Sequence, residues 1–147
     1  MTYFKCVLMH ITKYCYYHSI NNDQGETPNP DVLCNRYIKF AAFTSRCFQT
    51  GCDYVATGHY ARINTGNPVS RFSYGNELLR GVDRNKDQSY FLSEIDGRVL
   101  SRILFPVGSL QKSQVKKIAQ EAKLHVYNKK ESMGICFIGE RRMKCCY

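Results

Sequence analysis

The clearest periodic pattern in this chain starts after a rigid turn and predicts a helix. Pro28 and Pro30 fix their own φ angles and keep the residues before them extended, so the helical pattern starts at Asp31. From there apolar and small side chains recur at spacings of three and four, as along one face of a helix: Cys34, Ile38, Ala41, Ala42, Ser45 and Phe48. Gly51 stands where a glycine ends many helices, so the predicted helix closes there.

Apolar runs separated by turn residues predict an alternation of strands and helices after Gly51. Residues 53–57 form a short apolar strand that ends at Gly58 and His59, and the order helix, strand, glycine turn is typical of an α/β fold. Further along, the pattern predicts a loop or hairpin over 64–76, a strand over 77–82, a short helix over 88–95 and a break at 105–108.

The last part of the chain predicts a second long helix and a buried strand. Residues 113–124 place Val115, Ile118, Ala119 and Ala122 on one helical face, with lysines elsewhere that are most simply a solvated surface. The glycine-bounded run 134–139 is apolar throughout, which is typical of a strand in a core. Residues 1–26 follow neither period.

Composition narrows the class of protein only a little. The 147 residues suffice for one domain, and the formal net charge is +9. A polyanionic partner would explain this charge through phosphate contacts, and a solvated basic face explains it equally well. No run approaches the roughly 20 apolar residues that span a bilayer, and the first residues carry no secretion signal.

The eight cysteines favour reduced thiols in an intracellular compartment, because no secretion signal accompanies them. No C-x-x-C pair occurs, so the sequence disfavours a structural zinc site.

Two cysteines and one acid stand where reactive groups often lie. Asp31 and Cys34 are three residues apart and share a helical face, and the dipole of a first helical turn promotes a thiolate. The Asp31 carboxylate opposes this effect but can act as a general acid or base. Cys136 lies between Gly134 and Gly139, which let the backbone approach a ligand. A small buried core residue is the ordinary alternative for both cysteines.

Two other segments have the composition of binding sites. His59 follows the strand at 53–57, and open α/β sheets bind ligands at the carboxyl ends of their strands, although a structural histidine is the ordinary alternative. Residues 86–90 bring a cation, an amide and an aromatic ring together, which suits contacts with phosphates and bases. A capped helix start explains residues 86–90 equally well.

Taken together, these segments resemble the tRNA-specific 2-thiouridylase (MnmA/TRMU) family. Residues 27–40 are similar to its TPNPD-x-x-CN-x-x-IKF signature, and residues 56–61 to its ATGHYA block. The remaining matches follow in the family's order: LLRG at 78–81 with KDQSYFL at 86–92, FPVG at 105–108, and SMGICFIGER at 132–141. The five blocks span about residues 26–142.

The resemblance implies an α/β fold and a sulfur-transfer reaction. The fold would be a partial Rossmann-like catalytic domain of the adenine nucleotide alpha hydrolase-like, PP-loop ATPase type. The activity would be that of a tRNA-uridine 2-sulfurtransferase: ATP with Mg²⁺ activates the C2 oxygen of the wobble uridine, and a protein persulfide replaces it with sulfur. The implied partners are tRNA and a persulfide donor of the cysteine desulfurase pathway, with no membrane.

The resemblance also assigns roles to residues. Cys136 would carry the persulfide, and Cys34 would free the sulfide or close a disulfide with Cys136. Asp31 would be the acid or base, and Asn29, Pro30 and Asp31 would line the target base. Gly58 and His59 would lie at the nucleotide, and the tRNA-binding residues would include Lys86, Asp87 and Gln88.

The ends of the chain depart from the family pattern. The SGG-x-DS phosphate loop does not occur in this sequence, residues 1–25 carry no family motif, and residues 143–147 replace the usual continuation. We therefore expect residues 26–142 to be the C-terminal half of the catalytic domain, without its N-terminal strands, truncated at both ends and marginally stable alone.

These departures leave three possibilities for the function. The leading expectation is tRNA wobble-uridine 2-thiolation, impaired in this chain. The alternatives are a non-catalytic tRNA-binding remnant of the same family and a thiol redox or metal-binding module. Residues 78–81 and 86–92 look closer to the bacterial branch of the family, which favours the cytoplasm, with the mitochondrion as the alternative.

Overall fold

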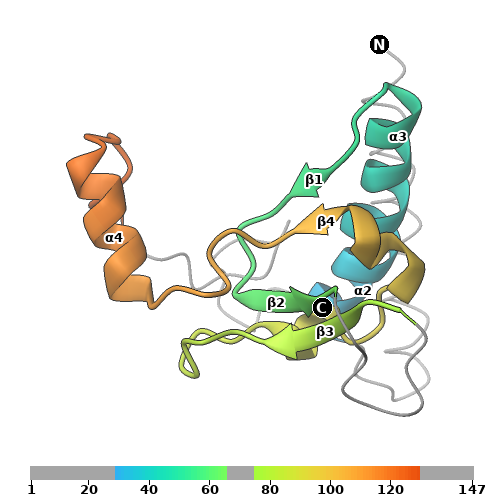
Figure 1. Ribbon diagram of the computed structural model, residues 1–147, viewed down its shortest axis with the longest axis horizontal. Coiled ribbons are helices and arrows are strands. Elements are labelled where there is room, and N and C mark those ends of the chain that lie inside the picture. Colours follow the sequence, from blue (N-terminus) through green and yellow to red (C-terminus); the bar gives the residue numbers. More distant parts are fainter. Residues whose placement is uncertain (1–28, 66–74, 130–147) are drawn as a thin grey trace, which may run out of the picture.

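The computed structural model describes residues 29–65 and 75–129. The predicted strand at 134–139 and Cys136 lie outside these ranges, as does most of the predicted loop at 64–76. Within the described ranges the elements follow the predicted order of a helix, strands, short helices and a final helix (Figure 1).

The first predicted helix is confirmed and forms a continuous helical column. It runs through α2 (Pro30–Leu33), the π-helical segment η1 (Cys34–Phe43) and α3 (Thr44–Gln49). Asn29 caps its start, and Pro30 at the first position has no amide proton to leave unbonded. Gly51 ends it with φ of 92°, a left-handed conformation that glycine adopts without a steric penalty.

The π-helical segment changes which side chains of this column are buried. Phe40 and Thr44 are buried, whereas Ala41 and Ser45, which the spacing placed on the periodic face, are exposed. A π-helix closes hydrogen bonds over five residues instead of four, so an apolar face counted with a period of 3.6 drifts out of phase. The predicted face was therefore wrong at those two positions.

Within residues 29–65 and 75–129, four short strands form two separate pairs. Strand β1 (Val55–Ala56) lies parallel to β4 (Ile103–Leu104), with Val55 opposite Ile103. Strand β2 (Ala61–Asn64) runs antiparallel to β3 (Glu77–Arg80), which confirms a hairpin around the predicted loop. The strands predicted at 53–57 and 77–82 are shorter than expected, and β4 was not predicted because a two-residue strand shows no period.

In the described part of the chain, two 3₁₀-helices connect β3 to β4. Segment η2 (Ser89–Leu92) lies in the first part of the helix predicted at 88–95, and η3 (Gly97–Arg102) precedes β4. The predicted break at 105–108 is confirmed as a turn, in which Gly108 donates a hydrogen bond to the Phe105 carbonyl.

The core lies between the helical column and the strands. Its buried cluster combines residues from the helical column, from three of the strands and from η2: Phe40, Val55, Ala61, Leu92 and Ile103. Helices packed on a parallel strand pair make this an α/β domain of partial Rossmann-like type, as predicted. Among the described residues, no helix has the length and apolar character needed to cross a membrane.

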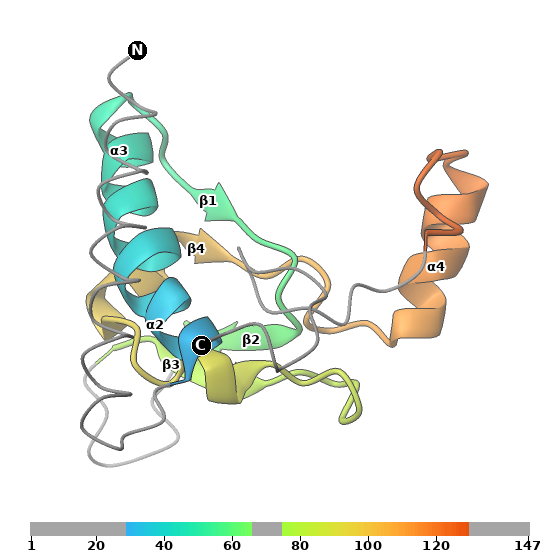
Figure 2. The ribbon, with the colours of Figure 1, turned by 180° about the vertical axis from the view of Figure 1, so that it is seen from behind.

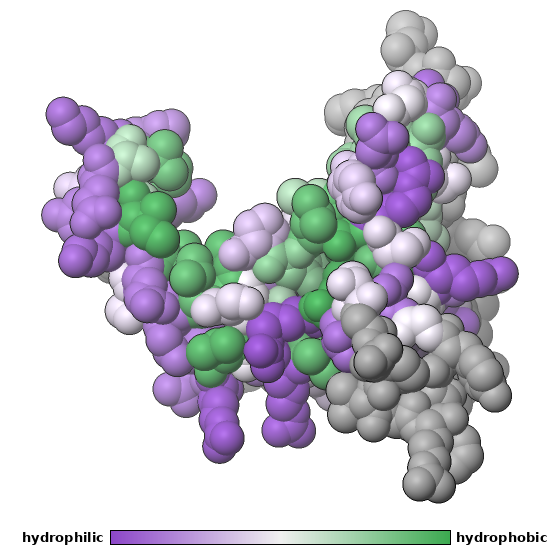
Figure 3. Space-filling model, viewed as in Figure 1, coloured by the Kyte–Doolittle hydropathy of each residue, from purple (hydrophilic) through white to green (hydrophobic). Residues whose placement is uncertain are grey.

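Helix α4 (Lys112–Glu121) stands apart from this core, as the front and back views both show (Figures 1 and 2). It confirms the second predicted helix, but none of its residues is buried. Ile118, on the predicted apolar face, is 52% exposed. Hydrophobic residues lie on the side of α4 that faces the rest of the molecule (Figure 3).

Candidate functional site

Three of the motif blocks meet at an aromatic cluster beside the helical column. The Phe40 ring lies 5.6 Å from the His59 ring, and the Phe105 ring lies 6.1 Å from each of them. These residues come from blocks that are far apart in sequence. The fold therefore joins the TPNPD, ATGHYA and FPVG segments into one region.

His59 is a buried neutral base in this cluster. Burial, with a smaller effect of the nearby Lys39 charge, lowers the pKa of His59 to about 4. Its Nδ1 lies 2.9 Å from the Thr57 hydroxyl oxygen, which fixes the plane of the ring. His59 follows the end of β1, as the sequence predicted, and it is uncharged at neutral pH.

The start of the helical column holds the predicted Asn29, Pro30 and Asp31. The Asn29 Oδ1 accepts hydrogen bonds from the backbone N–H groups of Asp31 (3.0 Å) and Val32 (3.3 Å). The Asn29 side chain therefore acts as a helix cap here. The half-buried Asp31 stands in the first turn, next to this cap.

Cys34 is buried, with 1% of its surface exposed, at the junction between α2 and the π-helical segment. The helix begins at Pro30, one residue earlier than predicted, so Cys34 is its fifth residue and lies beyond the first turn. The influence of a helix dipole fades within one turn, which weakens the sequence argument for an activated Cys34 thiolate.

Asn35 and Tyr60 are polar residues in this region to which the sequence reasoning gave no role. Asn35 is buried, and its Nδ2 donates to the Phe91 carbonyl at 2.9 Å, which ties the helical column to η2. The Asn35 Oδ1 and the Tyr60 hydroxyl are buried without a hydrogen-bond partner among the described residues. A buried group in this state calls for a ligand or a specific reason. An asparagine beside Cys34, on a largely apolar helix face, is the signal that could have identified the first of them.

The predicted tRNA-binding residues 86–88 form an internally bonded loop. Asp87 accepts hydrogen bonds from the Gly81 N–H (2.8 Å) and the Ser89 hydroxyl (2.8 Å). Burial alone would raise the pKa of Asp87, but these bonds keep it below its ordinary value. Gln88 accepts from the Tyr60 N–H (3.1 Å), and its own N–H donates to the Tyr60 carbonyl (2.9 Å). The Asp87 carboxylate and the Gln88 amide oxygen thus hold the loop against the strands.

Gly58, the predicted nucleotide contact, faces open space. A Cβ atom at Gly58 would meet no described residue within 4 Å, so a ligand could approach its backbone. For a metal ion the described residues offer less, because no group of three His, Cys, Asp or Glu side chains among them could hold one.

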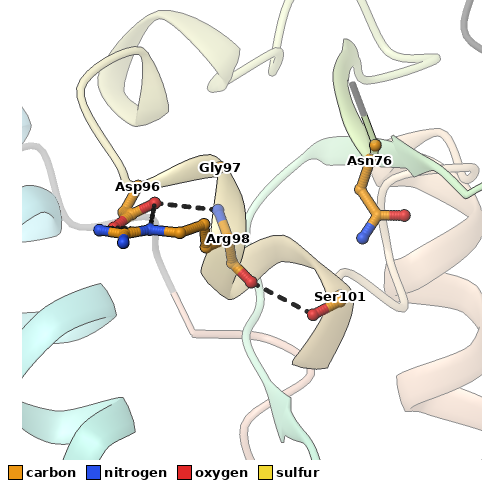
Figure 4. A pocket seen from close by; sticks show the side chains of 6 residues that line it. Asn76, Asp96, Gly97, Arg98 and Ser101 are labelled. Atoms are coloured by element: carbon orange, nitrogen blue, oxygen red, sulfur yellow. Dashed lines mark hydrogen bonds and ion pairs between the residues drawn. The ribbon is translucent and has the colours of Figure 1, made fainter. Parts of the chain in front are cut away.

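A separate hollow of about 480 Å³ is lined by none of these residues (Figure 4). Asp96 and Arg98 line it and point toward each other, so each satisfies the other's charge. Hydrogen bonds from the Arg98 side chain and backbone lower the pKa of Asp96 to about 2. The other lining residues are Gly75, Asn76, Gly97 and Ser101, and none of the lining residues was predicted as functional.

The motif at 132–141, which contains Cys136, lies outside the described residues. Within the described residues, Asn29 to Cys34 lie at the start of the helical column, and His59 contacts the same column further along, at Phe40. The contact between Cys34 and Cys136 stays a prediction.

A family model described as the tRNA methyl transferase HUP domain matches residues 11–140. The match includes the first four motif blocks and the fifth up to residue 140, and it also takes in residues 11–25, in which no motif was found.

Curated proteins of high similarity are tRNA-specific 2-thiouridylases MnmA from bacteria. The protein of Bacillus subtilis (strain 168) is 53% identical over 120 residues, which are 82% of this chain and 31% of the relative. The Staphylococcus aureus (strain JH9) protein is 52% identical over 122 residues, with the same two coverages. The chain therefore spans about a third of the length of these relatives.

Proposed function

Since the chain belongs to the family of the tRNA methyl transferase HUP domain, we propose that it is part of an enzyme that places sulfur on C2 of a tRNA uridine. The similar proteins from Bacillus subtilis and Staphylococcus aureus are named for this activity. The observation that carries the proposal is the packing of three matched motif blocks around Phe40, His59 and Phe105.

In the proposed reaction Cys136 carries a persulfide that a sulfur-relay partner loads, and Cys34 is its thiol partner. Cys34 attacks the persulfide to release sulfide, or closes a disulfide with Cys136 after transfer. Because Cys34 is 1% exposed, solvent thiols would reach it slowly, and this protects such a relay from unwanted exchange. Asp31, close to the start of the same helical column, is the candidate acid or base.

ATP with Mg²⁺ would supply the activation of the uridine C2 oxygen when bound. The described residues fit only part of this group. Gly58 leaves open space for the nucleotide, and the neutral His59 beside it adds no charge. The described residues hold no metal-ligand cluster, and the SGG-x-DS loop does not occur in the sequence, so we derive no step through ATP or Mg²⁺.

For the tRNA, Asn29, Pro30 and Asp31 would line the target uridine. The Asn35 Oδ1 and the Tyr60 hydroxyl, which have no hydrogen-bond partner in the described part of the chain, are further candidates for polar contacts with a ligand. Lys86 remains the cationic candidate of its loop, while the Asp87 and Gln88 side chains act through the loop shape that they hold. The relatives are bacterial, which supports the cytoplasm as the compartment.

The test is transfer of labelled sulfur from a persulfide donor to unmodified tRNA in the presence of ATP. A full-length relative serves as the positive control, and Cys136→Ser and Cys34→Ser of this chain as matched variants. Label on the tRNA that either substitution removes would establish the proposed reaction for this chain. Equal label with Cys136→Ser would contradict the role of Cys136.

If this chain transfers no label while the full-length control does, the result rejects catalysis by these 147 residues alone. Salt-dependent tRNA binding that survives loss of both cysteines would then favour the tRNA-binding alternative, because phosphate contacts need no thiol.

A further inference from the structure

We propose that Cys47 and Cys52 form a pre-organised dithiol site at the end of the helical column. By exchange with small disulfides, the two thiols form a disulfide reversibly. The pair is separate from Cys34 and Cys136 and has no part in the proposed sulfur transfer. Neither cysteine is in a disulfide in this structure.

The way α3 ends is what brings these two residues together. The Cys52 N–H donates to the Cys47 carbonyl, and the Gly51 N–H donates to the Phe48 carbonyl, both at 3.1 Å. With Gly51 in the left-handed conformation, these two bonds define a Schellman motif. In such motifs the side chains at the positions of Cys47 and Cys52 commonly make an apolar contact, and here both side chains are thiols.

The two thiols interact. Burial, the neighbouring Cys52 charge and a hydrogen bond with the Cys52 side chain raise the pKa of Cys47 above its ordinary value. Cys47 therefore stays a protonated thiol beside Cys52. Cys52 is exposed and Cys47 half-buried, so Cys52 is the sulfur that an incoming disulfide meets first.

Arg102 holds the Cys52 backbone in place from another part of the chain. Its Nη2 donates to the Cys52 carbonyl at 2.6 Å, and its Nε donates to the Asp53 carbonyl at 2.8 Å. Its guanidinium lies 3.7 Å from the centre of the Phe48 ring. These contacts keep the turn from opening, so the thiols stay close without a covalent link.

The reaction balances with a small disulfide as the oxidant. The Cys52 thiolate attacks one sulfur of the disulfide and expels a thiolate, leaving a mixed disulfide on Cys52. Cys47 then loses its proton to solvent and attacks the Cys52 sulfur, which expels the second thiolate. The two cysteines are oxidised by two electrons, and the small disulfide is reduced to two thiols.

A tryptic digest reads this pair without interference from the other cysteines. Cleavage after Arg46 and Arg62 releases residues 47–62, which contain Cys47 and Cys52 and no other cysteine. The full chain is equilibrated in mixtures of reduced and oxidised glutathione, and its free thiols are then blocked with an alkylating agent. After digestion, mass spectrometry measures the masses of the peptides. An internal disulfide gives a peptide that lacks both alkyl groups and two hydrogens.

We expect the internal disulfide to form in the native chain at a glutathione ratio at least ~10-fold more reducing than in urea, because the helix end raises the effective concentration of the two thiols. Arg102→Lys should make the difference between the native chain and the chain in urea smaller, because lysine cannot bind two carbonyl oxygens with one planar group. In Cys47→Ser, Cys52 should carry glutathione.

If the disulfide forms at the same glutathione ratio in the native chain and in urea, the proposal is overturned, because closeness in sequence alone would then explain the bond. Peptides that carry only alkyl groups or only glutathione across the whole series of buffers would overturn it as well. Neither outcome bears on the sulfur-transfer test, which depends on Cys34 and Cys136.

Discussion

His59 shows how burial sets the chemistry of a single residue. Its ring packs against Phe40 and Phe105, where a charged imidazole would lose its hydration. The lowered pKa makes His59 a neutral hydrogen-bonding group at any pH at which the cell operates, and not a proton carrier.

The stability of the chain should therefore fall in mild acid. The unfolded state binds a proton at His59 near pH 6.5, and the folded state only near pH 4. Above pH 6.5 this group therefore does not lower the free energy of unfolding, and as the pH falls below 6.5 the free energy of unfolding decreases. At pH 4.5 we expect a loss of about 2–3 kcal/mol from this group, since one pKa unit corresponds to ~1.4 kcal/mol. Urea unfolding at pH 7 and 4.5 measures the loss.

His59→Gln is the matched variant for this measurement, because glutamine is polar and does not titrate. It should lose less stability than the natural chain over the same pH interval. An equal loss in both would assign the acid sensitivity to other groups.

Asn29 is a second residue with a definable contribution. Replacing it with alanine removes the two hydrogen bonds that it accepts at the start of α2 and should lower the free energy of unfolding by about 1 kcal/mol. Asn29→Asp keeps an acceptor oxygen and should retain most of the stability. Urea denaturation of both variants checks this, and an unchanged alanine variant would show that the cap contributes nothing.

At the scale of elements, close contacts between backbones decide where glycine is required. A Cβ atom on Gly108 would clash with the Ala61 carbonyl oxygen, so the turn before α4 meets β2 with no room for a side chain. The FPVG motif thus ends in glycine for a packing reason. Its sequence predicted the turn but not the strand against which it lies.

Gly108→Ala should destabilise the chain by about 3 kcal/mol, in the upper range for overpacking, because two backbones must separate. Gly97→Ala is the control, since nothing lies within 4 Å of its Cβ position, and it should change the free energy of unfolding by less than about 1 kcal/mol. Thermal unfolding of both compares them. Similar effects of the two substitutions would contradict the close approach.

On the scale of the whole molecule, the distribution of buried contacts divides the described chain into two parts. The column and strands share one core, whereas α4 has no buried residue. The Asp83 carboxylate accepts a hydrogen bond from the Lys112 N–H (2.9 Å) and so anchors the start of α4. A helix of ten residues with so few buried contacts is marginal by itself in water.

The amides of α4 should therefore exchange with deuterium much faster than those of Ile38 to Phe43, by at least ~100-fold, since local opening of α4 disturbs no core. Hydrogen exchange with mass spectrometry on the full chain resolves the two segments. Equal protection would mean that the apolar face of α4 is covered, either by another part of the chain or by a second molecule.

The sequence by itself determined the order and type of the main elements and the family. Local rules are sufficient for this: prolines and Asn29 start the column, Gly51 ends it, and the five motif blocks keep their order. These features depend on neighbouring residues along the chain, which is the information that a sequence displays directly.

Only the tertiary structure decided which groups meet. It shifted the buried face of the column through a π-helical segment and paired the two-residue strands β1 and β4. It also buried the Asn35 Oδ1 and the Tyr60 hydroxyl where no described residue bonds to them. It also turned Asp87 and Gln88 inward and placed Arg102 over the turn beside Cys52. Each of these outcomes depends on contacts between distant segments, whose free energies local periodicity does not contain.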